Sequence, residues 1–192
     1  MRKSIEVVDG FYRDPVDRRE LALGSEWVAP DGASVFDEWT RDAFPDIEAT
    51  ARISALVGRD SDATFPTLAG RFTFVGNGGV RYWQRAAPHV HDEQWAALVY
   101  LAPPEGGFSS GVEFHRPASA ASTPGAWGSS GVHEVQHPDL WEETLYVPLT
   151  FNRMVLFQGS IAHRCAGRGF GRTPADGRVA QLFLFDEPVG GR

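Results

Sequence analysis

Residues 151–163 read FNRMVLFQGSIAH, and this stretch decides the fold that the sequence predicts. It contains a short apolar run, a glycine that favours a turn, and then His163. From Phe65 onward, similar runs rich in Val, Phe, Tyr and Leu alternate with Gly and Pro. The runs are residues 71–75, 95–101, 112–115, 144–147, 153–157 and 179–185. Short strands at such regular spacing, with little helix between them, are typical of an all-β sandwich or barrel.

The first third of the chain carries a different pattern. A short strand over residues 4–8 is followed by a helix between Pro15 and Gly24, and a second helix is predicted over residues 45–57. In the second helix, residues at four-residue spacing predict the buried face: Ile47, Ala51 and Ala55. The N-terminal part is therefore expected to pack as helices against the β structure.

Together these patterns predict a mainly β fold with flanking helices. The specific expectation is a double-stranded β-helix, the cupin-like jelly-roll barrel, with the N-terminal helices packed on it. The length of 192 residues suits one domain, residues 1–192, with residues 1–64 as helical support and residues 65–192 as the barrel. Residues 115–140 contain a segment rich in Ala, Ser, Gly and Pro, which predicts a long lid-like loop.

Composition narrows the partners that we expect. The net charge of −7 argues against a nucleic acid, which needs a basic surface, and against an anionic membrane. No apolar stretch approaches the ~20 residues of a membrane span, and the N-terminus does not resemble a signal peptide. Cys165 is the single cysteine, so no internal disulfide is expected, and a reducing, cytoplasmic compartment fits best.

The histidines suggest a metal site. In an extended segment, His89 and His91 point to the same face, and so does Glu93. Imidazole nitrogens suit iron, copper, nickel or zinc. A strand–turn–His element such as the one ending at His163 returns a third ligand to such a pair in a jelly-roll barrel. We therefore predict one metal ion between these segments. Three further histidines lie in or beside the lid-like loop and are expected to be solvated: His115, His133 and His137.

Arg178 begins the last apolar strand, in the stretch DGRVAQLFLFD. An arginine at a strand start usually faces water, but one inside a barrel is costly unless it is paired with an anion. The planar fork of its guanidinium suits a carboxylate. Arg178 is therefore a candidate for binding a carboxylate inside the barrel.

These residues resemble the iron(II)/2-oxoglutarate-dependent dioxygenase superfamily, and within it a bacterial and phage branch related to prolyl 4-hydroxylase. Three stretches carry the resemblance: VVDGFYRDPVDRRELAL, HVHDEQWAALVYLAPPEGGFSSGVEFHR and WEETLYVPLTFNRMVLFQGSIAHRCAGRGFGRTPADGRVAQLFLFDE. Members of the superfamily hold iron with two histidines and one carboxylate, written HxD/E…H. An arginine on a later strand binds the tail carboxylate of 2-oxoglutarate, and the resemblance implies this role for Arg178.

The sequence departs from the family pattern at one ligand. Aligned on Trp95 and the strand after it, His89 matches the first histidine of the motif and His91 matches its carboxylate. The ligands would then be His89, His91 and His163, with no carboxylate. A shift of two residues restores the usual form, with His91, Glu93 and His163. Strand alternation keeps one face in both alignments, and the alignment on Trp95 is the one that we favour.

The resemblance implies a non-haem iron(II), 2-oxoglutarate-dependent oxygenase that uses O₂ and hydroxylates a C–H bond of a small molecule or peptide. Tyr100 or Asn152 is a possible hydrogen-bond donor to the cosubstrate. The alternative is a three-His, cupin-like metal oxygenase that does not use 2-oxoglutarate. Arg178 favours the first interpretation. A non-catalytic binding module would have lost ligands, whereas three are present. The sequence leaves the substrate, the oxidative outcome and the oligomeric state open.

Overall fold

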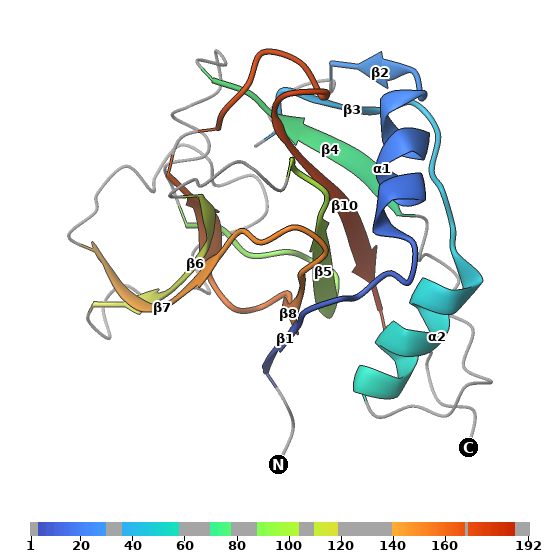
Figure 1. Ribbon diagram of the computed structural model, residues 1–192. Helices are drawn as coiled ribbons and strands as arrows, with labels where there is room; N and C mark the ends of the chain where they lie inside the picture. Colours follow the sequence, from blue (N-terminus) through green and yellow to red (C-terminus); the bar gives the residue numbers. More distant parts are fainter. Residues whose placement is uncertain are drawn as a thin grey trace.

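The protein is described by a computed structural model, which covers residues 4–29, 36–57, 70–77, 88–103, 110–118, 140–167 and 169–186. Two antiparallel β-sheets lie face to face, and two helices cover the outer face of the larger sheet (Figure 1). The prediction of a mainly β jelly-roll with N-terminal helices packed on it is confirmed. The division into support, barrel and lid stays a prediction.

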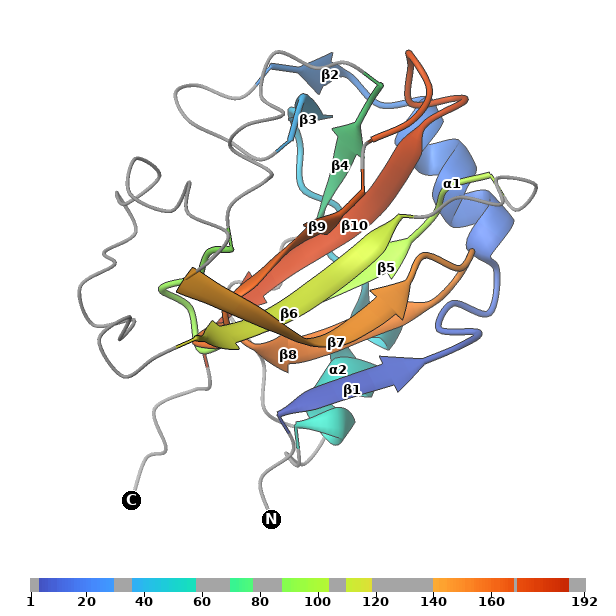
Figure 2. The ribbon, with the colours of Figure 1, turned by 90° about the vertical axis from the view of Figure 1, so that its left-hand side faces the viewer.

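The elements are distributed over two sheets and one helical layer (Figure 2). The helices are α1 (Pro15–Leu23) and α2 (Ile47–Leu56). The larger sheet has the spatial order β1 (Ile5–Val8), β8 (Met154–Gln158), β5 (Trp95–Tyr100), β10 (Arg178–Phe185), β4 (Arg71–Val75), β3 (Glu38–Thr40) and β2 (Trp27–Val28). The smaller sheet has the order β7 (Trp141–Pro148), β6 (Gly111–Pro117) and β9 (His163–Ala166).

The chain passes repeatedly between the two sheets. It leaves the larger sheet after β5, forms β6 and β7 in the smaller sheet, and returns as β8. It then crosses to β9 and back to β10. An isolated antiparallel bridge between His89 and His163 adds one further pairing beside β9. Segments far apart in the sequence are thus brought to the same place between the sheets.

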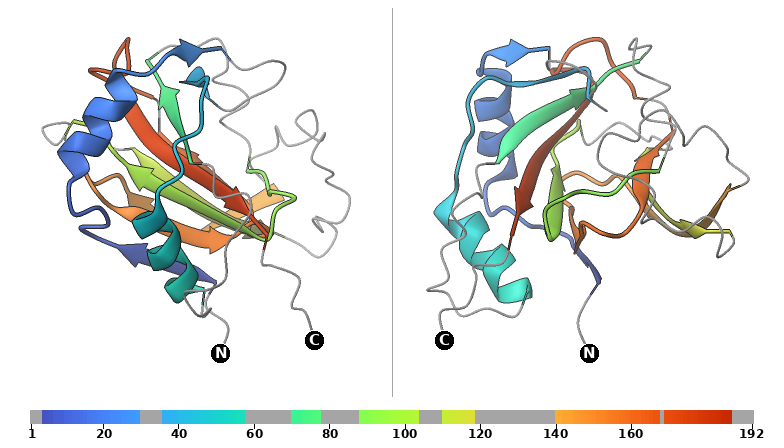
Figure 3. Two further views of the ribbon diagram at one scale, coloured as in Figure 1. Left: turned by 90° about the vertical axis from the view of Figure 1, so that its right-hand side faces the viewer. Right: turned by 180° about the vertical axis from the view of Figure 1, so that it is seen from behind.

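Both faces of the larger sheet are buried, which explains why its central strands read as continuous apolar runs. On β5, the residues that face the helices are Trp95, Ala97 and Val99. The residues that face the smaller sheet are Ala96, Leu98 and Tyr100. The helices close the first of these layers from outside (Figure 3). The second layer lies between the sheets, where the candidate site is found.

Helix α2 forms where it was predicted, but its buried face is not the predicted one. The Asp46 side chain caps the helix by accepting a hydrogen bond from the Ala49 N–H at 2.7 Å. Ala49 and Ile53 are buried, whereas Ile47 is 90% exposed. Ala51 and Ala55 are also exposed. The prediction of the face was wrong because its two alanines offer little apolar area, so the larger Ile53 decides which side faces the sheet.

Other predictions of local structure differ in detail. The two short strands β2 and β3, which lie between the two helices in the sequence, were not predicted. Strand β7 begins three residues before its predicted start at residue 144. Most of the predicted lid, residues 119–139, lies outside the described residues, and so do His133 and His137. Among the described residues, no helix is long and apolar enough to cross a membrane.

Candidate metal centre

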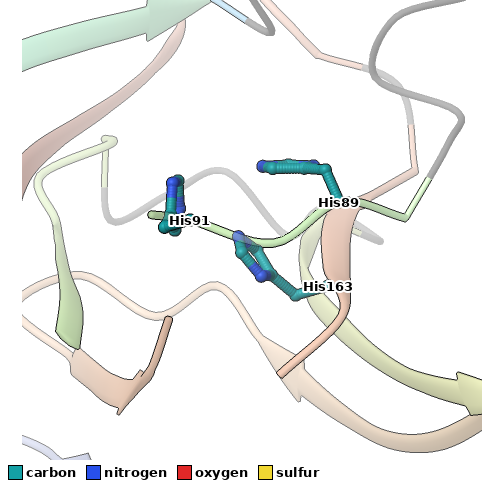
Figure 4. A group of neighbouring side chains, drawn as sticks. All are labelled: His89, His91 and His163. Carbon is teal, nitrogen blue, oxygen red and sulfur yellow. The ribbon is translucent and has the colours of Figure 1, made fainter. Parts of the chain in front are cut away.

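Three histidines from two distant parts of the chain meet between the sheets (Figure 4). One ring nitrogen from each of His89, His91 and His163 lies within 4.8 Å of the others. The ring centroid of His163 is 4.4 Å from that of His89 and 4.8 Å from that of His91. These are the three residues that the alignment on Trp95 selects. The structure therefore brings together all three of the favoured candidate ligands.

The backbone holds each of these histidines in place. His89 and His163 exchange two N–H to carbonyl hydrogen bonds, each of 2.9 Å, across the isolated bridge. The His91 N–H donates to the Gly159 carbonyl at 2.8 Å. A Cβ at position 159 would collide with the Glu93 carbonyl oxygen, so this close approach requires glycine. The turn after β8 thus anchors the HxH segment and also leads to His163.

Hydrogen bonding assigns a tautomer to His163. Its Nδ1 is 2.9 Å from the Ile161 carbonyl oxygen, which can only accept, so Nδ1 carries the proton and donates it. Nε2 is then left with a lone pair for a metal ion, and the Ile161 carbonyl fixes the ring orientation. The Phe157 ring, with its centroid 4.5 Å from that of His163, packs beside the imidazole.

Burial keeps the His91 and His163 imidazoles neutral. Burial lowers the pKa of His91 to about 4, against a partial opposing effect of Asp92. Burial also lowers the pKa of His163 well below its ordinary value, and His89 and His91 lower it further. Neutral imidazole is the form that binds a metal, so these nitrogens need not lose a proton first at neutral pH.

Glu93 does not join the three histidines. The extended path from His89 ends in a bend over residues 92–94, so the alternation that would carry Glu93 to the same face is broken. Among the described residues, the group of possible metal-binding side chains contains no carboxylate. This geometry favours the alignment in which His91 occupies the carboxylate position.

Arg178 lies in the same pocket as the histidines, and Cys165 and Leu98 are also on its wall. The Arg178 side chain is buried, and its Nη2 donates to the Gly111 carbonyl at 2.8 Å. Its Nη1 has no hydrogen-bond partner among the described residues. A buried cation with a free donor favours an anion beside it.

Tyr100 lies next to Arg178, with the guanidinium carbon 5.6 Å from the ring centroid. Its side chain is fully buried, and its hydroxyl also lacks a hydrogen-bond partner within the described part of the chain. Burial raises the pKa of Tyr100, with the Arg178 charge acting in the opposite direction, so the hydroxyl stays protonated and able to donate. The Arg178 Nη1 and the Tyr100 hydroxyl therefore lie close together in the interior, each without a hydrogen-bond partner among the described residues.

Two other residues named from the sequence have different positions. Asn152 pairs with the Tyr12 backbone, accepting its N–H at 2.7 Å and donating to its carbonyl at 2.8 Å. Its suggested contact with a cosubstrate is replaced by this structural role. His115 is buried, and its Nε2 lies 3.4 Å from the Glu113 carboxylate, which also accepts from Arg164. His115 belongs to this separate cluster and does not join the three histidines.

No known protein family matches the sequence, and no curated protein matches it either. Solved structures do match the fold. SnoN, a non-heme alpha ketoglutarate dependent epimerase from nogalamycin biosynthesis, aligns with a TM-score of 0.59 and 15% identity over 97% of this chain and 79% of its own. A Pseudomonas putida prolyl-4-hydroxylase aligns with a TM-score of 0.53 and 14% identity over 96% of this chain and 93% of its own. The chain therefore has the fold of an enzyme named as alpha ketoglutarate dependent and of a prolyl-4-hydroxylase, as the sequence resemblance implied.

Proposed function

We propose that this protein is a non-haem iron(II), 2-oxoglutarate-dependent oxygenase that hydroxylates a C–H bond of a small molecule or peptide. The observation that carries the proposal is one pocket that combines three imidazoles with a buried arginine whose Nη1 has no hydrogen-bond partner among the described residues. The first group suits a divalent transition metal and the second suits a carboxylate. The Arg178 Nη1 has no hydrogen-bond partner among the described residues, which points to a bound anion beside it.

In this proposal, His89, His91 and His163 hold the iron. The residues fit the ion, because imidazole is a ligand that iron accepts and the three ring nitrogens converge on one point. Bound iron would supply the activation of O₂ coupled to oxidation of 2-oxoglutarate. The chain itself supplies neutral ligands, a fixed His163 ring and an apolar wall that includes Phe157 and Leu98.

Arg178 and Tyr100 would bind the far carboxylate of 2-oxoglutarate. The guanidinium offers charge and a free N–H, and the Tyr100 hydroxyl offers a second donor. A carboxylate placed there satisfies both buried donors at once, which removes the desolvation cost of leaving them unpaired. The same pair gives the cosubstrate a fixed orientation relative to the three histidines.

The proposal also covers the class of substrate and the cellular compartment of the enzyme. One SnoN structure is named as a complex with Fe³⁺, alpha ketoglutarate and nogalamycin RO. A pocket between the sheets is compatible with a small organic substrate or a single peptide side chain. The expectation of a cytoplasmic enzyme rests on the single cysteine of the sequence.

The second candidate function is the three-His oxygenase that acts directly on a chelating substrate. The absence of a carboxylate from the histidine group, among the described residues, favours it. It gives no role to Arg178 and Tyr100, however, which would remain buried and unsatisfied. We rank it second for that reason.

The test is anaerobic addition of iron(II) and 2-oxoglutarate to metal-free protein, followed in the visible spectrum. We expect a weak charge-transfer band that appears only when both are present, because 2-oxoglutarate chelates the bound iron. His163→Ala should abolish iron binding and the band. His115→Ala is the matched control, since His115 is also buried but lies outside the histidine group, and it should retain both.

The other outcomes are equally informative. Stoichiometric iron binding without the band would favour the three-His oxygenase. Retention of stoichiometric iron by His163→Ala would contradict the proposed centre, and so would a wild-type protein that binds no iron.

A further inference from the structure

We infer that His91 makes the metal centre selective for ions that prefer imidazole, and that it excludes manganese. The inference rests on the proposed metal centre and concerns which ion that centre accepts. It adds a specificity-determining role for one residue, at the position where the related sequence pattern has a carboxylate. The ions expected to bind well are iron(II), cobalt(II), nickel(II) and zinc(II), and the ion expected to bind poorly is manganese(II).

The ligand set carries this inference. The three side chains that converge are all imidazoles, with one ring nitrogen from each within 4.8 Å of the others. Neutral nitrogen ligands suit the later first-row ions, whereas carboxylate oxygens suit magnesium, calcium and manganese. The histidine group contains no carboxylate among the described residues, so it lacks the ligand type by which manganese is usually held.

Nearby acidic groups are placed so that none replaces the missing carboxylate. Asp92 is exposed, and Glu93 lies in the bend outside the histidine group. Glu113 is already committed, because its carboxylate accepts from Arg164 Nε at 2.5 Å and lies near His115. None of these three acidic residues therefore supplies a carboxylate ligand to the centre.

The position of His91 allows its side chain to be exchanged without moving the backbone. Its N–H is held by the Gly159 carbonyl, a bond that does not depend on the side chain. Its ring lies against His89 and Phe157, with centroid separations of 5.4 Å and 6.4 Å. An aspartate is smaller than the ring that it replaces, so it fits the space and brings one negative charge to the ion.

The experiment compares wild type, His91→Asp and His91→Asn, each prepared metal-free. Nickel(II) and manganese(II) are titrated by calorimetry, and bound manganese is also followed by electron paramagnetic resonance. No turnover is involved. We expect wild type to bind nickel at least about 1,000-fold more tightly than manganese. His91→Asp should narrow that ratio at least about tenfold, while His91→Asn, which has the same size but no charge, should not improve manganese binding.

The possible failures separate the inference from the proposed function. If nickel binds but His91→Asp leaves the nickel-to-manganese ratio unchanged, the inference is wrong and the metal centre stands. If His91→Asn narrows the ratio as much as His91→Asp does, size rather than charge sets selectivity, and the inference is again wrong. If wild type binds neither nickel nor iron, the proposed metal centre falls and the inference falls with it.

Discussion

Gln181 and Arg178 lie on opposite faces of the same strand, β10, and their exposed fractions are 0% and 4%. Gln181 faces the helices. Its Oε1 accepts from the Tyr12 hydroxyl at 2.5 Å, and its Nε2 donates to the Phe44 and Gly70 carbonyls at 3.1 Å each. Arg178 faces the smaller sheet, and its Nη1 has no partner among the described residues. Burial is nearly the same at the two positions, so what differs is hydrogen bonding.

The difference separates structural polar groups from groups that bind ligands. On the helix side, Gln181 and Asn152 are saturated by contacts within the fold, and they tie the helical layer and the N-terminal segment to the sheet. Between the sheets, the Arg178 Nη1 and the Tyr100 hydroxyl have no hydrogen-bond partner among the described residues. Buried polar groups without partners are rare in native proteins, and each requires an explanation. A ligand between the sheets is the explanation that we propose.

The largest effect on stability is expected from Gln181→Met. The substitution leaves the Tyr12 hydroxyl and the Phe44 carbonyl buried without this partner, at about 1–3 kcal/mol for each group. We therefore expect the free energy of unfolding to fall by about 3–4 kcal/mol in denaturant titrations. Binding of metal and 2-oxoglutarate by the folded fraction should stay at the wild-type level. A variant as stable as wild type would show that the hydrogen bonds of Gln181 on the helix side do not stabilise the fold.

The stability of the metal-free protein should depend on pH because of His91, which lies between the two sheets. The folded pKa of His91 is about 4 and its ordinary value is 6.5, so between these values the unfolded chain binds more protons. Stability is therefore complete above about pH 6.5 and declines as the pH falls toward 4. One pKa unit corresponds to about 1.4 kcal/mol, so His91 contributes up to about 3 kcal/mol.

The measurement is urea unfolding of metal-free protein at several pH values, with His91→Asn as the control. The variant should lose part of the slope between pH 6.5 and 4, because its side chain does not titrate. Saturating nickel(II) should raise stability at neutral pH and steepen the decline, since protons compete with the ion for the same nitrogens. Identical slopes for wild type and His91→Asn would show that His91 is not held neutral by burial.

Much of the fold is predictable because its central strands bury both faces. β4 has the predicted bounds, β5 and β10 differ from theirs by one residue at one end, and β8 is shifted by one residue at both ends. The pattern was weaker elsewhere. Short edge strands such as β3 have too few residues to show an alternation. On α2, small alanines made the apolar spacing ambiguous, and the wrong face was predicted.

The candidate site also has parts that the sequence predicted and parts that it did not. The convergence of His163 with the HxH segment followed from the strand–turn–His pattern, and the structure brings these residues together. Strand alternation could not choose between His89 and Glu93 as a ligand, because residues two apart share a face in any extended segment. In the structure, the bend over residues 92–94 favours His89, and the ligand set stays a prediction. Asn152 was named only as a possible donor to the cosubstrate. It lies in a turn with a φ of 60°, in the left-handed region, and its side chain pairs with the Tyr12 backbone.

The comparison is sharpest in Arg178→Met, which places the same side chain as Gln181→Met on the other face of β10. No anion pairs with Arg178 among the described residues, so replacing this buried cation should leave the free energy of unfolding of the metal-free protein unchanged or higher. The affinity for 2-oxoglutarate should fall by about 10- to 100-fold, because a charge-assisted hydrogen bond worth about 1.5–3 kcal/mol is lost. Metal content should remain at the wild-type level, since Arg178 is outside the histidine group.

Calorimetry with the anaerobic iron-loaded protein gives the affinity, and denaturant titration of the metal-free protein gives the stability. Arg116→Met is the control, because Arg116 pairs with Glu142 on the exposed side of the smaller sheet and should affect neither quantity by much. Unchanged affinity for 2-oxoglutarate would remove Arg178 from the proposed cosubstrate site. A loss of stability as large as that of Gln181→Met would mean that both polar residues of β10 serve the fold, and that unsatisfied donors in this barrel do not mark a ligand.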